Sequence, residues 1–286
     1  MRLCRFDAGA GPEIGVVADG AIVPVTRTLP NIGHDMSAVI AAWNVLRPDF
    51  EEVEATGKER LALGFVRLLA PVARPGKIMA IGLNYADHIA ESGMATPEQQ
   101  IWFSKAPTAV NGPFDVIDLP AVPVPHVDYE AEMVAVVGKG GRRIGRDAAA
   151  GAIFGYCVGN DVTERAWQHA TPQWVLGKSF DTHAPFGPWI TTADEVGDPH
   201  VLDITLTVNG ETRQTSNTRH LVFDVWAQVE HLSTAMTLLP GDLIYTGTPG
   251  GVGAAMKPMR FLADGDVVRI EIDRLGAIEN RCGASG

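Results

Sequence analysis

Three acidic residues stand at every second position in the stretch VDYEAEMVAVVG: Asp128, Glu130 and Glu132. The stretch is otherwise mostly apolar and predicts a β-strand, in which alternate side chains project to the same face. Carboxylates that share a face repel each other unless water or a cation compensates their charge. An exposed strand entrance is the ordinary explanation, and a bound cation is the alternative. Because apolar residues continue the same face, we expect the acids to lie on a rim and not on an open surface.

A divalent cation needs a third oxygen ligand from another part of the chain. Glu130 and Glu132 supply two ligands of the kind that Mg²⁺ or Mn²⁺ takes. Asp161 offers a third, because the apolar strand in AIFGYCVGNDVTERAWQ stops just before it. Its alternative role is the N-cap of a helix, with Glu164 at the capping-box position, and for an isolated Asp the cap is the commoner role.

His88 and Glu91 form a second pair of chemically useful residues, in GLNYADHIAES. On a helix their spacing of three places them on the same side, and a carboxylate beside an imidazole raises its basicity. Such a pair can take a proton from water. The alternative is a surface pair without function. We expect an apolar strand in KIMAIG before the pair, and a mobile lid in SGMATPEQQ after it.

Two further stretches have polar groups that suit an anionic substrate. Lys178 stands in LGKSFDTHAPFGPW, where an ammonium would balance negative charge on a substrate. YTGTPGGVG, residues 245–253, is a glycine-rich turn that matches neither the Walker loop nor GxGxxG. Its backbone N–H groups and Thr248 could hold a carboxylate. We also expect the stretch SGMATPEQQIWFSKAP to line a distal pocket, with apolar walls from Trp102, Phe103 and Trp174.

Short β-rich runs must position these residues. They are FDVIDLP, VDYEAEMVAVVG, AIFGYCVGNDVT, ITLTVNGE, DLIYTGTP, DVVRIEID and GAIENRCG, separated by turn signals. One long helix is predicted in HLVFDVWAQVEHLSTAMTLL. Its helically spaced core stripe is Val222, Val225, Trp226, Val229, Leu232 and Met236. The fold class is therefore mainly β with some α, arranged as a roll or barrel-like sheet.

The first part of the chain looks like a small unit of its own. EIGVVADGAIVPV predicts a hairpin about Asp19-Gly20, and the residues after it predict helical pieces interrupted before Pro48. APVARPGK is the best linker candidate. We therefore predict a small N-terminal α/β domain over residues 1–72 and a catalytic domain over residues 73–286.

Composition narrows the class of protein. The chain has 286 residues, of which 46% are hydrophobic and 20% charged, as in soluble globular proteins. Its net charge of −11 argues against nucleic acid as a partner. No run of 18 apolar residues and no signal-type start occurs, so neither a membrane nor secretion is indicated and a cytoplasmic protein is expected. The three cysteines are widely spaced, which argues against disulfides or a thiolate site, and Cys157 is expected to be a buried small hydrophobe.

Together these stretches resemble the fumarylacetoacetate hydrolase family, in its short branch of acylpyruvases and diketo-acid hydrolases. The matching stretches, in the order of the family, are GLNYADHIAES, DYEAEMVAVVG, GYCVGNDVTERAWQ, LGKSFDTHAPFGPW, LLPGDLIYTGTPGGVG and GDVVRIEIDRLGAIEN. The resemblance implies a mixed β-roll catalytic domain, usually paired as a homodimer. The chain departs from fumarylacetoacetase in its short leading segment and in MAIG, which lacks a further upstream carboxylate, and this argues against fumarylacetoacetate as the substrate.

The resemblance also implies a role for each candidate residue. One divalent cation per chain, Mg²⁺ or Mn²⁺, is expected on Glu130, Glu132 and Asp161. His88 and Glu91 are expected to activate water, and Lys178 to lie beside the substrate oxygens. The residues expected to bind substrate are Tyr85, Arg165, Gln168 and Thr248.

The implied reaction is hydrolysis of a C–C bond in a 2,4-dioxo acid, which gives a pyruvate-type product and a carboxylic acid. The same enolate chemistry also serves a 2-oxo acid decarboxylase, isomerase or hydratase, and these are the alternatives. Ureidoglycolate lyase is a less favoured reading. A metal-stabilised binding protein without catalytic activity is an alternative of another class, but it does not explain why His88, Glu91 and Lys178 occur together.

Overall fold

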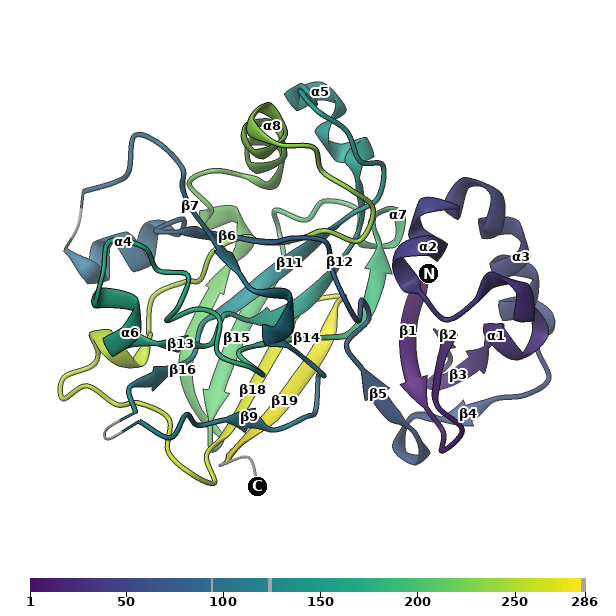
Figure 1. Cartoon of the computed structure of the whole chain (residues 1–286), viewed down its shortest axis with the longest axis horizontal. Helices are drawn as coiled ribbons and strands as arrows, with labels where there is room; N and C mark the ends of the chain where they lie inside the picture. The colour runs from purple at the N-terminus through teal and green to yellow at the C-terminus, as the bar shows by residue number, and fades with distance from the viewer. Residues whose placement is uncertain (94, 123–124, 284–286) are drawn as a thin grey trace.

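The computed structural model describes residues 1–93, 95–122 and 125–283 of the chain. A small N-terminal part, purple in Figure 1, lies at one end of the molecule beside a larger body that is built mostly from strands. One sheet runs through both parts, because β1 (Arg2–Asp7) pairs antiparallel with β14 (Ala184–Thr192). The predicted fold class, mainly β with a small N-terminal domain, is confirmed.

The remaining strands of this long sheet come from all parts of the chain. They are β2 (Pro12–Ala18), β3 (Ala21–Pro24), β4 (Leu61–Ala62), β5 (Arg67–Leu69), β6 (Ile78–Gly82), β7 (Ile101–Lys105), β8 (Val110–Asn111), β11 (Ala131–Val137), β12 (Ile153–Asn160) and β17 (Leu243–Tyr245). Their order is β4-β3-β2-β1-β14-β12-β11-β17-β6-β7, with β5 beside β1 and β8 beside β14. β11, at whose start Glu130 and Glu132 lie, and β12, which Asp161 follows, are therefore neighbours in its middle.

Two smaller sheets complete the larger body. One has the order β16-β15-β18-β19-β9 and the other pairs β10 with β13. Their bounds are β9 (Ile117–Asp118), β10 (Val127–Asp128), β13 (Thr163–Glu164), β15 (Asp203–Val208), β16 (Glu211–Asn217), β18 (Val267–Ile272) and β19 (Gly276–Gly283). The main hydrophobic core lies where β15, β18 and β19 face β11 and β12. Every β-rich run predicted from the sequence contains a strand of the structure.

β11 is buried on both faces, which explains its continuous apolar run. Met133, Ala135 and Val137 face the main core. Val134 and Val136 face a second core that includes residues of β1, β14 and the N-terminal helices. Glu132 precedes Val134 on this second face by one strand period, so the acidic end of the strand runs directly into packed apolar surface.

The predicted strand over residues 127–138 is wrong in one respect, because it is broken at Tyr129 and Glu130. The Glu130 N–H donates to Asn160 Oδ1 at 2.9 Å and leaves the strand ladder. Asp128 belongs to β10, where it pairs with Thr163 of β13. The side chain of Asp128 therefore does not join Glu130 and Glu132 in one acidic face.

The helices are short and lie around the sheets. They are α1 (Val25–Thr28), α2 (Met36–Ala41), α3 (Trp43–Thr56), α4 (Ala86–Ser92), α5 (Arg146–Ala149), α6 (Arg165–His169), α7 (Ala193–Val196) and α8 (Val225–Ala235). Single 3₁₀ turns are η1 (Pro30–Ile32), η2 (Leu63–Phe65), η3 (Pro107–Ala109), η4 (Ala150–Ala152), η5 (Thr218–His220) and η6 (Gly253–Ala255). No helix in the described part of the chain is both long and apolar enough to cross a membrane.

Two predicted helix boundaries are wrong. The helical break predicted before Pro48 falls at Ala42 instead, and Pro48 lies inside α3 on its exposed side, where water can replace the missing hydrogen bond. α8 is shorter than predicted, because Asp224 accepts the Ala227 N–H at 2.9 Å and caps its start. Val222 therefore lies outside the helix and is partly exposed.

The cysteines behave as predicted. Cys4, Cys157 and Cys282 are buried and free. Burial raises the pKa of each thiol, so none of the three favours the reactive thiolate form.

Candidate active site

The three predicted metal ligands lie together where β11 begins and β12 ends. Each of Glu130, Glu132 and Asp161 offers an oxygen atom within 4.8 Å of the others. Their exposed fractions are 5%, 1% and 0%. Because isolated buried carboxylates are costly, positive charge must compensate this cluster.

Two buried lysines supply part of that charge. Lys178 Nζ lies 2.7 Å from Glu130 Oε2 and 2.6 Å from Asp161 Oδ2. Lys105 Nζ lies 2.6 Å from Asp161 Oδ1 and also donates to the Val162 carbonyl. The sequence analysis missed Lys105, which stands at the end of β7 and has no distinctive motif around it. Lys105 contacts Asp161 across 56 positions of the chain, a long-range contact that no local pattern in the sequence indicates.

The lysines leave the cluster unevenly compensated. Burial raises the pKa of Glu130, but Lys178 and Arg165 outweigh it and lower that pKa to about 2. Burial, followed by the charges of Asp161 and Glu130, raises the pKa of Glu132 well above its ordinary value. The Gly247 N–H, which donates to Glu132 Oε2 at 2.7 Å, opposes this rise but does not cancel it, so without a cation the protein favours a proton on Glu132.

A divalent cation fits this arrangement. Carboxylate oxygens are the ligands that Mg²⁺ and Mn²⁺ prefer, and a cation would compensate the charge that the lysines leave on Glu132. Among the described residues, Tyr85 Oη, Tyr245 Oη and Asn160 Nδ2 are buried without a hydrogen-bond partner. The charge of Glu132 helps to raise the pKa of both tyrosines beyond the effect of burial. The two tyrosine hydroxyls can donate or accept hydrogen bonds, and Asn160 Nδ2 can donate them, so water bound with a cation could satisfy all three.

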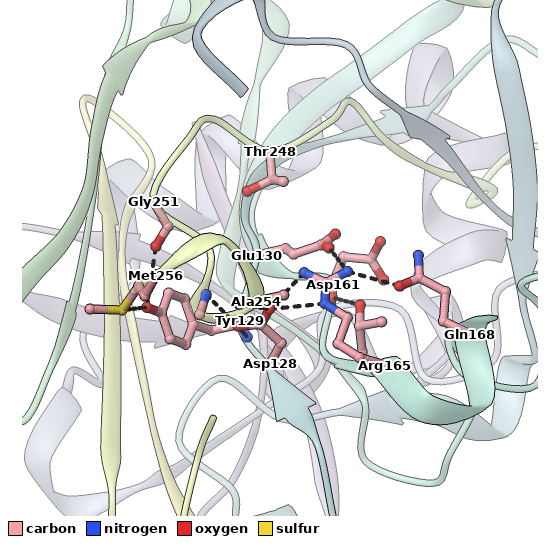
Figure 2. Close-up of polar contacts among 12 residues, drawn as sticks. Asp128, Tyr129, Glu130, Asp161, Arg165, Gln168, Thr248, Gly251, Ala254 and Met256 are labelled. Carbon is pink, nitrogen blue, oxygen red and sulfur yellow. Dashed lines mark hydrogen bonds and ion pairs between the residues drawn. The ribbon is translucent and has the colours of Figure 1, made fainter. Parts of the chain in front are cut away.

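Arg165 joins the cluster to a second carboxylate, as Figure 2 shows. Its Nη1 lies 2.7 Å from Glu130 Oε1 and donates to Gln168 Oε1 at 3.0 Å. On its other side Nε donates to Asp128 Oδ2 at 2.9 Å. Arg165 begins α6, whose N-cap is Glu164 with its side chain accepting the Trp167 N–H. Of the two roles open to Asp161, the cap is therefore excluded.

His88 and Glu91 share one side of α4, as their spacing predicted. His88 Nδ1 lies 3.7 Å from Glu91 Oε2, which is close enough for an electrostatic interaction and too long for a hydrogen bond. Glu91 Oε2 accepts the Gly251 N–H at 2.8 Å. The stretch SGMATPEQQ, predicted to be a lid, includes position 94, which lies outside the described residues.

The segment of residues 247–254, here called the glycine segment, connects these groups. Its amides were expected to hold a substrate carboxylate, but four of them bind carboxylates of the protein itself. Gly247 donates to Glu132 and Gly251 to Glu91, whereas Gly253 and Ala254 both donate to Asp128. These four donors are therefore occupied by protein side chains and are not available to a substrate carboxylate.

A cavity of about 550 Å³ opens beside the cluster. Its wall includes the predicted residues His88, Glu91, Glu130, Arg165, Gln168, Lys178 and Thr248. Apolar side chains line the rest, among them Ile81, Phe103, Trp174, Val252, Met256 and Met259. Phe103 and Trp174 are thus where the sequence analysis expected them, whereas Trp102 packs against the main core.

Three predicted site residues do not line the cavity. Glu132 and Asp161 belong to the cluster and are covered by other side chains. Tyr85 is fully buried at the N-cap of α4, and Glu132 influences its pKa. Its assignment as a substrate ligand stays a prediction, and the structure gives it a place near the carboxylate cluster.

Comparison with known proteins establishes the family. The family model Fumarylacetoacetate (FAA) hydrolase C-terminal matches residues 77–282, and the model Rv2993c-like, N-terminal matches residues 1–71. The chain belongs to the fumarylacetoacetate hydrolase family. It is 40% identical to "Oxaloacetate tautomerase FAHD2A, mitochondrial" of Bos taurus, over 98% of this chain and 91% of that protein.

Solved structures of the fumarylacetoacetate hydrolase family also match the whole chain. Maleylpyruvate hydrolase from Sphingobium sp. SYK-6, in complex with manganese (II) ion and pyruvate, is 37% identical with a TM-score of 0.86 and full coverage of both chains. 5-Carboxymethyl-2-hydroxymuconate delta-isomerase from Mycobacterium smegmatis is 36% identical with a TM-score of 0.80 and full coverage of both chains. The protein is therefore an enzyme of this family with a buried acidic site for a divalent metal.

Proposed function

We propose that this protein is a metal-dependent hydrolase that cleaves a C–C bond of a 2,4-dioxo acid, as in the acylpyruvase branch of the family. The products would be a pyruvate-type acid and a carboxylic acid. The main support is the position of the His88–Glu91 pair, which lies on the wall of the same cavity as Glu130, Arg165 and Lys178. One small substrate can therefore contact both an acid–base pair and the positively charged groups beside the metal ligands.

The proposed metal is Mg²⁺ or Mn²⁺, held by Glu130, Glu132 and Asp161. Bound there, it would supply the Lewis acidity that polarises the 2-oxo group of a substrate. The 37% identical maleylpyruvate hydrolase, whose structure contains manganese and pyruvate, supports both the metal and a pyruvate-like ligand.

The residues of the chain are assigned the following parts in the reaction. His88 takes a proton from water while Glu91 stabilises the imidazolium that forms. The hydroxide adds to the C4 carbonyl, the C3–C4 bond breaks, and its electron pair remains on C3 as a pyruvate-type enolate. A proton then returns to C3. The ammonium group of Lys178, on the cavity wall, stabilises the negative charge of the enolate.

Substrate binding is assigned to Arg165, Gln168 and Thr248. Arg165 and Gln168 extend from α6 to the cavity wall, and Thr248 lies in the glycine segment. The Thr248 hydroxyl accepts a hydrogen bond from Gln214 at 2.9 Å and keeps its own proton to donate to a substrate oxygen. The apolar wall suits the carbon chain beyond C4.

Keto–enol tautomerisation of a 2-oxo acid is the second candidate reaction. The 40% identity to an oxaloacetate tautomerase over nearly the whole chain favours it. The His88–Glu91 pair would then move a proton at C3 without adding water. The two reactions share the cavity and the metal site, and they differ in whether a C–C bond breaks.

A product assay distinguishes the two reactions. Purified protein with Mn²⁺ is mixed with acetylpyruvate, fumarylpyruvate or maleylpyruvate, and loss of the enol absorbance is followed while pyruvate is quantified. Metal-dependent release of one pyruvate per substrate supports hydrolysis. Faster ketonisation of enol-oxaloacetate without pyruvate release from any dioxo acid supports tautomerisation instead, and release of CO₂ from oxaloacetate would indicate the decarboxylase.

A His88→Ala variant tests the assigned base. We expect its kcat to fall by about 100-fold or more, the usual contribution of a general base, with Mn²⁺ affinity unchanged. His231→Ala on α8 outside the cavity wall is the control and should retain activity. Full turnover by the His88 variant would exclude the mechanism.

We also propose a homodimer on family resemblance, and sedimentation velocity should then give twice the mass of one chain.

A further inference from the structure

Asp128, which the sequence placed among the acids of the site, has contacts unlike those of Glu130 and Glu132. It is completely buried. Oδ2 accepts from Arg165 Nε at 2.9 Å, lies 2.8 Å from Arg165 Nη2, and accepts the Ala254 N–H at 2.9 Å. Oδ1 accepts the Gly253 N–H at 2.8 Å and the Tyr129 N–H at 2.9 Å. One carboxylate therefore binds two separate segments at once.

Both of these segments form walls of the cavity. Arg165 lines it directly and contacts Glu130 on the opposite side of its guanidinium. Gly253 and Ala254 begin η6, and the residues around them contribute further wall positions, namely Val252, Ala254, Ala255 and Met256. Figure 2 shows Asp128 between Arg165 and Ala254. The distance between these two walls is thus set through Asp128.

The residues around Asp128 leave the glycine segment little freedom to take another position relative to this carboxylate. A Cβ atom on Gly253 would lie 2.7 Å from Asp128 Oδ1 and 2.1 Å from the Arg260 carbonyl oxygen, so this close approach requires glycine at position 253. Tyr129, next to Asp128, donates from its hydroxyl to the Gly251 carbonyl at 3.2 Å. Two adjacent residues, Asp128 and Tyr129, therefore both bind the glycine segment.

Charge gives Asp128 a further effect on Arg165. With Asp128 on one side and Glu130 on the other, the buried guanidinium is held between two carboxylates. Without the Asp128 carboxylate, Nε and Nη2 of Arg165 would lose their partner, and the guanidinium would be free to turn about its remaining contact with Glu130. A displacement of about 1 Å in a site of this kind is enough for a loss of about 100-fold.

We propose that Asp128 is a positioning residue: it fixes Arg165 and the Gly253–Ala254 wall in the geometry that binds the 2-oxo acid end of the substrate. The inference rests on the proposed function, because Arg165 is assigned there to the substrate. Asp128 acts through Arg165 and does not line the cavity itself.

The test measures binding and needs no turnover. Mn²⁺-saturated protein is titrated with oxalate and with pyruvate by calorimetry, for wild type, Asp128→Asn, Arg165→Met and the double variant. We expect Asp128→Asn to bind oxalate about 10- to 100-fold more weakly, the usual loss when an orienting partner is removed. In the Arg165→Met background the same change should cost less than about 3-fold, because its intermediary is already absent.

Asp242→Asn is the matched control. Asp242 is also buried, accepts the Leu239 N–H at 2.7 Å, and has Lys77 Nζ at 2.6 Å, but it does not line the cavity. It should lose thermal stability without losing oxalate affinity. If Asp128→Asn does not fold, Asp128→Glu keeps the charge and displaces the carboxylate, and we expect it to weaken oxalate binding by at least several-fold.

Several results would overturn the proposal. They are wild-type oxalate affinity in the folded Asp128 variant, an equal loss with and without Arg165, and an equal loss in Asp242→Asn. A wild-type protein that binds neither oxalate nor pyruvate with Mn²⁺ would instead overturn the proposed function, and the inference with it.

Discussion

Replacing Glu132 by Gln should stabilise the metal-free protein. Without metal, Glu132 either stays charged, and a carboxylate within 4.8 Å then repels it by about 3 kcal/mol at an effective dielectric constant of about 20, or takes up a proton, which at neutral pH costs a similar amount because the ordinary pKa of Glu is about 4.3. Lys178 and Lys105 offset part of that repulsion, so we expect a gain of about 1–2 kcal/mol. The amide oxygen of Gln can still accept the Gly247 N–H, and its NH₂ group can donate to a neighbouring carboxylate.

The same change should remove the response to metal. At a free Mn²⁺ concentration of 100 times Kd, wild type gains about 2.7 kcal/mol. With an unfolding entropy of about 2.1 cal/mol/K per residue, a chain of 286 residues has about 0.6 kcal/mol/K, so its Tm rises by about 4–5 °C. If the loss of one ligand weakens binding 100-fold, the variant at the same concentration gains only about 0.4 kcal/mol, or less than about 1 °C.

Differential scanning calorimetry in EDTA and in Mn²⁺ at neutral pH checks both effects. The variant should be the more stable protein in EDTA and the less stable one in Mn²⁺. Glu13→Gln is the control, because Glu13 is a buried carboxylate paired with Arg27 in the N-terminal part. It should lower Tm in EDTA and keep the Mn²⁺ shift. A Glu132 variant less stable than wild type in EDTA, yet still shifted by Mn²⁺, would refute the charge argument and the metal site together.

Two further predictions concern buried basic side chains outside the proposed proton transfer. Burial lowers the pKa of His183 from 6.5 to about 4, so the folded protein holds the neutral ring and loses about 3 kcal/mol as the pH falls from 6.5 to 4. His183→Gln should lack that part of the acid destabilisation in urea titrations at several pH values, and an unchanged pH slope would contradict it. Lys105→Met should lower Tm in EDTA by about 5 °C, because losing one partner of a buried pair costs about 3 kcal/mol or more. Added Mn²⁺ should raise its Tm by more than it raises that of wild type, and an equal or smaller shift in scanning calorimetry would contradict this reading.

The metal ligands could be predicted because their signals are local. The spacing of Glu130 and Glu132 gives their shared face, and the apolar run before Asp161 shows where a strand ends. The interruption at Tyr129 could not be predicted in the same way, because it depends on a hydrogen bond from Glu130 to Asn160, thirty positions along the chain. The separate role of Asp128 follows from that break.

Other features of the structure could not be predicted, because the local sequence favours a different interpretation. β14 holds a central place between β1 and β12, yet its sequence contains Pro185 and Pro188, which argue against a central strand. From its sequence Lys105 is expected to be an ordinary surface lysine, and only the tertiary fold brings it to Asp161, 56 positions along the chain. Local patterns therefore indicate which residues can do chemistry, whereas long-range pairing decides which of them meet.

The occupied amides of the glycine segment affect how this site can change during evolution. In many anion-binding loops the backbone itself selects the ligand, and backbone geometry is slow to alter by mutation. Here Glu132, Glu91 and Asp128 occupy four of those donors, so under the proposed function recognition of the substrate falls to side chains such as Gln168, Thr248 and Trp174. Single substitutions can exchange such side chains while the braced backbone and the metal ligands stay in place. An enzyme with this arrangement can acquire new substrates while its metal ligands and the contacts of its backbone remain unchanged.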